Sequence, residues 1–286
     1  MKLPACLVFN AMMAATLSVA ALAQDSATAP SPAPNTGITW RLNTDYIPHA
    51  LFHRKTSGGA WIDVTPKALR EMAKETADRF DFSQNCALCP LDANRAWLAV
   101  NIQNRILVEY TSSGGKEWTE HAGPPASDWV CLSFLDEKEG FVMGARGSLG
   151  NHREWVYHTS DGGTHWQEMP SPTKEGSSYY ANGIVFRTPL QGWITATYHG
   201  VPDVPFFHTT DGGRTWNIQT LDIPAEYRGG YGNTSPPIFV GKDKMHGFLP
   251  VELVNNQTPV RRDATIVYET DDGGITWRLP KPGLQR

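Results

Sequence analysis

The chain has 286 residues, with 25 Lys or Arg, 29 Asp or Glu and 9 His, so its formal net charge is −4 at pH 7. The charges are spread along the sequence. This composition gives no electrostatic reason to expect nucleic acid or an anionic membrane surface as a partner.

The first 23 residues are predicted to be a signal peptide. Lys2 gives a positive start, Ala5 to Leu22 is mostly apolar, and Ala21-Leu22-Ala23 fits a small-x-small cleavage rule. The alternative is an uncleaved membrane anchor, and no later stretch is long enough to form a membrane span. Cleavage removes one Lys and no acid, so the mature net charge is 24 − 29 = −5. The chain is therefore expected to be exported, either periplasmic or secreted.

Residues 24–36 are rich in Ala, Ser, Pro and Thr and are expected to be a disordered linker, because they cannot bury a core. The folded domain is predicted over 37–286. It opens with Gly37 to Leu42, which repeats Gly274 to Leu279 letter for letter. We therefore expect the two ends of the domain to lie close together.

Residues 66–77 are the one convincing helix. Thr65 can cap it, Pro66 suits its first position, and apolar residues recur on one face. The helix is predicted to be an insertion at the rim of the domain.

Three cysteines remain after cleavage: Cys86, Cys89 and Cys131. Export predicts a disulfide. Cys86 and Cys89 would lie roughly 10 Å apart in an extended strand, beyond disulfide reach. The preferred bridge is Cys89–Cys131, since repeat alignment places Cys131 in the equivalent strand of the next repeat with the same strand parity. A Cys86–Cys89 bridge in a turn and three unpaired thiols remain alternatives.

One octet recurs about every 50 residues along the chain. It reads TTDGGRTW at 209–216, TDDGGITW at 270–277 and TSDGGTHW at 159–166, with worn copies at 111–118 and 56–61. Recurrence at this period indicates a repeat architecture.

Asp followed by Gly-Gly predicts a tight turn, because Gly adopts positive φ freely and the carboxylate can accept backbone N–H groups. The following Trp is predicted to pack between sheets. These positions are therefore assigned structural roles: Asp161, Gly163, Trp166, Asp211, Gly213, Trp216, Asp272, Gly274 and Trp277.

A second hairpin precedes each octet, with a polar turn and then Gly-aromatic, as in Gly140-Phe141 and Gly192-Trp193. Two hairpins per repeat give four strands, the composition of one propeller blade. Blades are predicted at about 84–121, 128–170, 180–221 and 236–279, with a poorer one at 38–64. The fold class is thus an all-β propeller of about five four-stranded blades.

The octet resembles the Asp-box, or bacterial neuraminidase repeat, of sialidase-type propellers. The combined unit is similar to the repeat of the photosystem II stability/assembly factor family over residues 84–279. That resemblance implies a non-catalytic module that binds a protein or an envelope polymer. Five repeats rather than seven, and the inserted helix, depart from the family, so its partner is not carried over.

The alternative function is a sialidase-like glycoside hydrolase or a carbohydrate-binding propeller. The Arg-Ile-Pro element of sialidases is missing, since the nearest text is Asp45-Tyr46-Ile47-Pro48. Two-carboxylate chemistry stays open, because folding alone could bring such a pair together. Enzyme activity therefore stays open, and the residues favour a protein without catalytic activity.

Binding residues are predicted in irregular loops, where function tends to sit on a rigid all-β scaffold. Tyr227, Arg228 and Tyr231 combine amphipathic rings with a guanidinium, residue types that dominate binding hot spots. Tyr179 and Tyr180 form a second candidate patch. No metal pattern or cofactor motif is evident, and the mature protein is expected to be a monomer.

Overall fold

The computed structural model describes residues 38–42, 51–55, 59–75, 86–102, 105–125, 129–146, 153–172, 179–198, 204–255 and 262–280. The predicted signal peptide and linker lie outside these residues, as do the first three residues of the worn box at 56–61. In the described part, no helix has the length and apolarity needed to cross a membrane.

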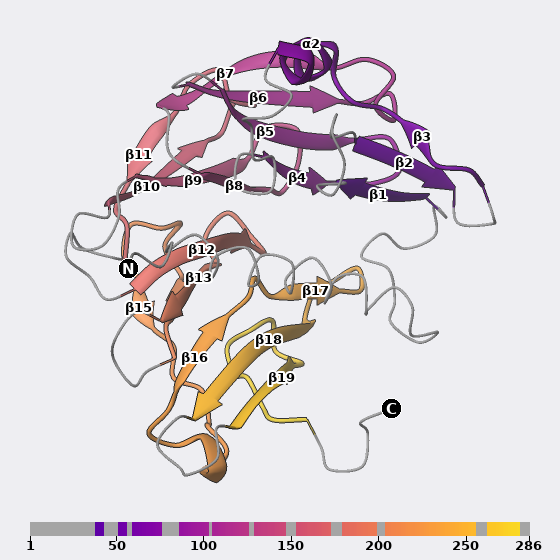
Figure 1. Cartoon of the computed structure of the whole chain (residues 1–286). Helices are drawn as coiled ribbons and strands as arrows, with labels where there is room; N and C mark the ends of the chain where they lie inside the picture. The colour runs from indigo at the N-terminus through magenta and orange to yellow at the C-terminus, as the bar shows by residue number, and fades with distance from the viewer. Residues whose placement is uncertain are drawn as a thin grey trace, which may run out of the picture.

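The described strands form five antiparallel sheets, which we call blades 1 to 5. They follow one another in chain order along an arc (Figure 1). Blade 1 holds β1 (Ile38–Leu42), β2 (Leu51–Lys55) and β3 (Ile62–Asp63); blade 2 holds β4 (Cys86–Pro90), β5 (Ala96–Ile102), β6 (Arg105–Thr111) and β7 (Thr119–Pro125). Blade 3 holds β8 (Trp129–Phe134), β9 (Gly140–Arg146), β10 (Arg153–Thr159) and β11 (Gln167–Met169).

Blade 4 holds β12 (Tyr179–Phe186), β13 (Gly192–Tyr198), β14 (Phe206–Thr209) and β15 (Asn217–Ile218). Blade 5 holds β16 (Tyr231–Thr234), β17 (Ile238–Val240), β18 (His246–Asn255) and β19 (Arg262–Thr270). Among the described residues, α2 (Lys67–Glu75) is the α-helix and η1 (Ala225–Tyr227) a short 3-10 turn. The predicted all-β propeller with one short helix is confirmed.

The two terminal blades depart from the predicted four-stranded pattern. Blade 1 has three described strands. In blade 5, β16 and β17 pair with different parts of the same side of β18, so the inner strand is split in two. Among the described residues, the pairing beyond β19 is a single bridge, between Glu269 and Arg278. The expected closure of the ends is not formed by strand pairing, because no described strand of blade 1 pairs with blade 5.

Each Asp-box turn is closed by a threonine as well as by its aspartate. In blade 4, the Thr209 hydroxyl accepts the N–H groups of Asp211 at 3.3 Å and Gly213 at 2.9 Å, and donates to Asp211 Oδ1 at 2.8 Å. The Asp211 carboxylate also accepts the Thr215 hydroxyl at 2.6 Å and the Thr215 N–H at 2.9 Å. These bonds lower the pKa of Asp211 to about 2, because they favour its charged form.

The worn box of blade 2 keeps this arrangement with a hydroxyl in place of the carboxylate. Ser113 Oγ accepts the Glu117 N–H at 2.9 Å, and the Thr111 hydroxyl accepts the Gly115 N–H at 3.0 Å. The first Gly of each box then donates to the other turn of its own blade. In blade 3, Gly162, at φ 69°, donates to Lys138 O at 2.9 Å. Loss of the carboxylate therefore weakens the box without changing its shape.

The box Trp residues tie each blade to the one before it. The indole Nε1 of Trp118 donates to Val64 O at 2.8 Å, that of Trp166 to Ala122 O at 2.8 Å, and that of Trp216 to Pro170 O at 3.0 Å. Each acceptor lies in or directly after the outer strand of the preceding blade. Trp277 is the exception, since its buried Nε1 has no hydrogen-bond partner in the described structure.

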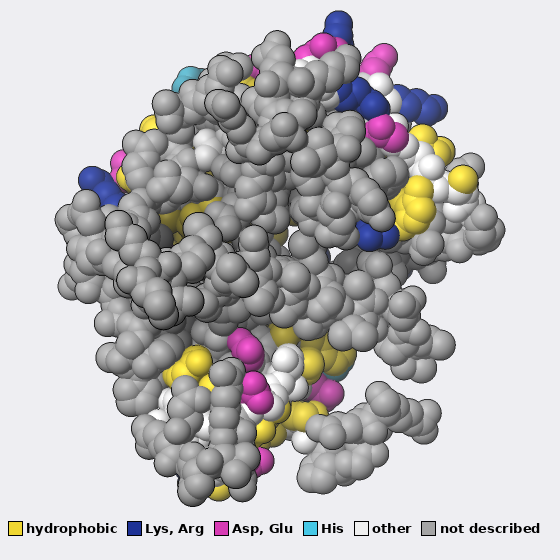
Figure 2. Space-filling model, in the orientation of Figure 1, with side chains coloured by type: hydrophobic (Ala, Val, Ile, Leu, Met, Phe, Trp, Pro, Cys, Tyr) yellow, Lys and Arg dark blue, Asp and Glu magenta, His cyan; other side chains and the backbone are white. Residues whose placement is uncertain are grey.

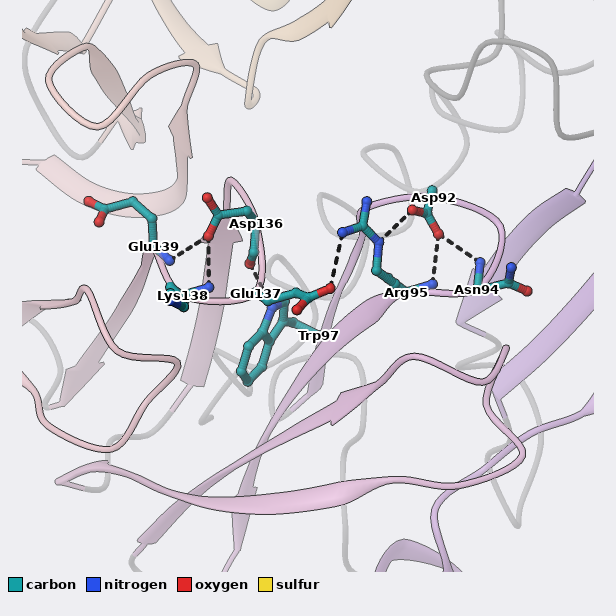
Figure 3. Close-up of polar contacts among 8 residues, drawn as sticks. All are labelled: Asp92, Asn94, Arg95, Trp97, Asp136, Glu137, Lys138 and Glu139. Atoms are coloured by element: carbon teal, nitrogen blue, oxygen red, sulfur yellow. Dashed lines mark hydrogen bonds and ion pairs between the residues drawn. The ribbon is translucent and has the colours of Figure 1, made fainter.

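The turns between the first two strands of blades 2 and 3 are joined to each other (Figure 3). Asp92 Oδ1 accepts the N–H groups of Asn94 at 2.8 Å and Arg95 at 2.9 Å, and Asp136 makes the equivalent bonds in blade 3. Arg95 bridges the two blades, with Nε 2.6 Å from Asp92 and Nη1 3.1 Å from Glu137. These links hold the blades in register on the side that carries the boxes.

The predicted Cys89–Cys131 disulfide is not formed, and Cys86, Cys89 and Cys131 are all thiols. Cys89 faces blade 3, where its Sγ lies 3.6 Å from Phe134 O. Cys131, on blade 3, faces the next interface along the arc, toward the cluster between blades 3 and 4. The shared strand parity is the reason, because equivalent residues of successive blades both point forward along the arc. Burial raises the pKa of both thiols.

Blade 2 contains a buried carboxyl without a full set of partners. Glu109 is 3% exposed and lies opposite Glu120 in the β6–β7 ladder. Its Oε1 has no hydrogen-bond partner in the described structure. Burial, with a smaller contribution from the Glu120 charge, raises the pKa of Glu109 to about 7.

We expect Asp272→Ala to lower the free energy of unfolding by about 1–3 kcal/mol, because Thr276 N–H and the Thr270 hydroxyl lose their acceptor. Ser113→Ala should cost clearly less, since a neutral hydroxyl makes the corresponding bonds. Urea denaturation of the two variants measures the difference. Equal losses would show that the box carboxylate is not the main acceptor.

Glu109→Gln is expected to stabilise the protein at pH 8 by an amount on the order of 3 kcal/mol relative to wild type. The folded-state pKa is raised, so the stability that the protonated carboxyl contributes is fully present below pH 4.5 and is lost as pH rises through about 7. The difference in free energy of unfolding between wild type and Glu109→Gln should therefore shrink as the pH falls toward 4.5. Thermal denaturation from pH 4.5 to 8 tests this, with exposed Glu117→Gln as the matched control. A parallel pH profile for wild type and Glu109→Gln would contradict it.

Candidate functional site

A pocket of about 210 Å³ lies between blades 4 and 5 and contains three of the predicted binding residues. The β16 strand, the end of β15 and the segment between them supply most of its lining. The lining residues are Val204, Ile218, Thr220, Leu221, Ile223, Tyr227, Arg228, Gly229, Gly230, Tyr231 and Leu253. The structure thus brings Tyr227, Arg228 and Tyr231 together around one concave surface.

The loop that forms the pocket is fixed by hydrogen bonds at both ends. Tyr268 Oη donates to Asp222 O at 2.7 Å, and Asn255 Nδ2 donates to Glu226 O at 2.9 Å. Between these anchors, η1 closes with Tyr227 N–H donating to Pro224 O at 2.9 Å. The pocket is therefore preformed, which reduces the ordering cost of binding.

Gly230 is required by the close approach of this loop to β18. A Cβ at residue 230 would lie 2.0 Å from Val254 O, so a larger residue would push the loop off the sheet. The preceding Gly229 has a φ of 81°, a conformation that L side chains rarely adopt. The two glycines thus allow the chain to enter β16 with Tyr231 beside the pocket.

Arg228 is an exposed cation at the rim of the pocket. Its Nε donates to Ile223 O at 3.2 Å. Its two terminal nitrogens make no hydrogen bond in the part of the chain that the structure describes. One hydrogen bond holds the guanidinium in place, and its two terminal nitrogens stay available to pair with a carboxylate.

The lining is otherwise apolar, and no Asp or Glu is among the residues that line this pocket. Ile218 is 59% exposed there, so an apolar surface is available to a ligand. Sequence reasoning identified the two tyrosines and Arg228 but missed the aliphatic contribution of Ile218, Leu221 and Ile223. Aliphatic residues in a strand or a loop give no sign in the local sequence that they line a pocket.

Tyr179 and Tyr180 do not line this pocket. Both lie on β12 and are half buried. The ring of Tyr179 packs edge-on against that of Phe207, with 6.0 Å between the ring centroids. Tyr179 also contacts the hydrophobic core between blades 3 and 4. The structure therefore separates the two predicted patches, and Tyr179 has a packing role.

A second pocket, of about 300 Å³, lies where the inner turns of blades 3, 4 and 5 meet. Its carboxylates are Asp136 and Asp243, and each accepts backbone N–H groups of its own turn. Hydrogen bonds from the Glu139 and Lys138 N–H groups hold the pKa of Asp136 below its usual range. Asp136 in this state is a poor general acid, and its carboxylate is occupied by the turn that it closes.

Figure 2 shows one face of the molecule, on which acidic and hydrophobic side chains are mixed in the lower half and basic and acidic side chains are interspersed near the upper right edge. No extended field of one charge sign covers the described residues on this face. Among the described residues, no three His, Cys, Asp or Glu side chains are grouped so as to hold a metal ion.

Residues 111–226 match the family model described as photosynthesis system II assembly factor YCF48. The photosystem II assembly lipoprotein Ycf48 of Synechococcus sp. (strain CC9902) is 26% identical over 182 residues, which are 63% of this chain and 45% of the relative. The match thus spans less than half the length of that relative.

Two solved structures are similar at low identity. A structure of YCF48 bound to a D1 peptide is 14% identical, with a TM-score of 0.34, and the alignment covers 69% of this chain and 82% of that one. The GH74 xyloglucanase of Xanthomonas campestris is 12% identical, with a TM-score of 0.49, and the alignment covers 86% of this chain and 36% of that one. Likeness at this level says nothing about activity.

The matched residues 111–226 run from the box of blade 2 to the loop after blade 4, so they include two further Asp-boxes and their Trp contacts. The resemblance of this chain to the Asp-box propellers, and among them to the photosystem II assembly factor repeat, is thereby confirmed.

Proposed function

We propose that this chain is an exported, non-catalytic propeller that binds a protein during the assembly of a larger complex in the cell envelope. The observation that carries the proposal is the preformed pocket in which Tyr227, Arg228 and Tyr231 meet an apolar lining. Similarity to an assembly lipoprotein supports the type of role and the export.

The chemistry of the pocket fits a protein ligand. Aliphatic and aromatic side chains can bury an apolar residue of the partner, while the free edge of Arg228 can pair with a carboxylate beside it. Hydrolysis of a glycoside by two carboxylates has no support at this pocket, because no Asp or Glu lines it.

Arg228→Ala is expected to weaken capture of the partner with little change in Tm, because the side chain is exposed and makes one hydrogen bond. The triple change of Tyr227, Arg228 and Tyr231 to Ala should weaken binding further, by about 2 kcal/mol or more for each hot-spot residue. Tyr227 packs against the core between blades 4 and 5, so the triple variant should also lose some thermal stability.

The measurement is affinity capture from the native cell envelope with the mature domain, followed by titration of the identified protein against each variant. Ile275→Ala is the matched control, because Ile275 is 64% exposed on blade 5 but does not line the pocket. Unchanged affinity for Arg228→Ala and the triple variant would contradict the pocket as the binding site. Hydrolysis of a sialoside or other glycoside by the wild type, abolished by one carboxylate substitution, would contradict the non-catalytic role.

A further inference from the structure

Strand β19 is the third strand of blade 5, the position that a fourth, outer strand covers in blades 2, 3 and 4. The outermost strand of the blades pairs with its neighbour through five residue pairs in blade 2, three in blade 3 and two in blade 4. In blade 5 this cover is reduced to the bridge between Glu269 and Arg278. The nine-residue strand β19 therefore leaves most of its outer side unpaired.

The direction of the unpaired groups follows from that bridge. Glu269 exchanges two hydrogen bonds with Arg278, each 2.9 Å, so its N–H and C=O point outward. Alternation along a strand turns the same groups of Val267 and Thr265 outward, and those of Ile266 and Tyr268 toward β18. No hydrogen bond from the outward groups of Val267 or Thr265 is present in the described part of the chain.

The chain's own continuation is unable to cover this edge as a strand. In the register of the bridge, paired residue numbers add to 269 + 278 = 547, so residue 280 would face Val267 and residue 282 would face Thr265. Both are proline. Proline has no N–H, so neither can donate to the two outward carbonyl groups.

The sequence disfavours the linker on this edge and a second copy in the register centred on Ile266. The linker at 24–36 carries prolines at alternate positions, Pro30, Pro32 and Pro34, which remove three donors along one side. A second copy paired antiparallel about Ile266 would place Asp263 opposite Glu269 twice, and like charges directly opposite one another are destabilising.

We propose that the β19 edge binds an extended segment of another protein, which adds to blade 5 as its missing outer strand. The segment runs antiparallel to β19 and has no proline opposite Thr265 or Val267. Its residue opposite Ile266 is apolar, because Ile266 packs against the cluster that contains Leu253 and Tyr268. This surface goes beyond the proposed pocket and does not depend on it.

Amide hydrogen exchange on the full chain tests the proposal, with a synthetic peptide of residues 279–286 carrying Pro280→Val, Lys281→Val and Pro282→Val as the probe, so that an apolar residue lies opposite Ile266. The probe should slow exchange at Thr265 and Val267 by about tenfold or more at saturation. The same peptide with its native prolines is the matched control and should slow neither. The amides of Ile266 and Tyr268, which face β18, should be protected throughout and report that blade 5 is folded.

A full-chain variant with Pro280→Val, Lys281→Val and Pro282→Val gives the same test within one molecule. Its own C-terminal segment should then pair along β19, protect Thr265 and Val267 and exclude the probe. Three results would overturn the proposal. The first is protection of the Thr265 and Val267 amides in the wild type alone at low concentration, and the second is protection of these amides that rises with wild-type concentration. The third is that neither the probe nor the substitutions in the variant protect them. The first assigns the edge to the chain itself and the second to a second copy.

Discussion

The hydrogen bond from the box indoles of blades 2, 3 and 4 to the outer edge of the preceding blade is the interaction on which this propeller depends. A four-stranded blade cannot bury both of its faces alone, so it is stable only against a neighbour. The Trp166 and Trp216 rings lie in the spaces between blades and give each contact a fixed direction, because the indole donor must reach a particular carbonyl. The box turn beneath the ring determines where that donor lies. The box is thus at once a local turn motif and the joint between repeats.

Blade 5 shows what happens where this joint is incomplete. Trp277 is buried against Trp193, Phe206 and Phe239, yet its indole N–H has no acceptor in the described structure. The segment that would supply the acceptor is the loop that leaves β15 and forms the pocket around Tyr227. The same blade has a split inner strand and an almost absent outer strand. These differences give blade 5 its pocket and its uncovered strand edge.

The function of a propeller depends on its sites rather than on its fold, because propellers with very different activities share the same blades. The pocket between blades 4 and 5 offers apolar area and one guanidinium, whereas the carboxylates near the inner turns are held by backbone N–H groups. Binding a partner requires complementary surface, which the pocket provides. Glycoside hydrolysis requires two free carboxyl groups across a substrate, which neither described pocket provides.

The sequence by itself determined the repeat, the all-β class, the helix after Thr65 and the structural role of the box residues. These follow from local chemistry: a Thr-x-Asp-Gly-Gly turn closes through bonds within a few residues, so its letters are sufficient to predict it. The importance of the threonine could have been read from its presence in every copy, but its hydroxyl geometry was visible only after folding.

Only the tertiary structure decided which side chains meet between blades. Cys89 and Cys131 share a strand parity, and the sequence could not show that equal parity makes both point forward and keeps them apart. The same holds for the binding residues: Tyr227 and Tyr231 line a pocket with Ile218 and Leu253, while Tyr179 packs into the core. Local patterns fix turns and strands because the interacting groups are near in sequence, whereas pockets and interfaces join residues whose distance depends on how successive blades stack.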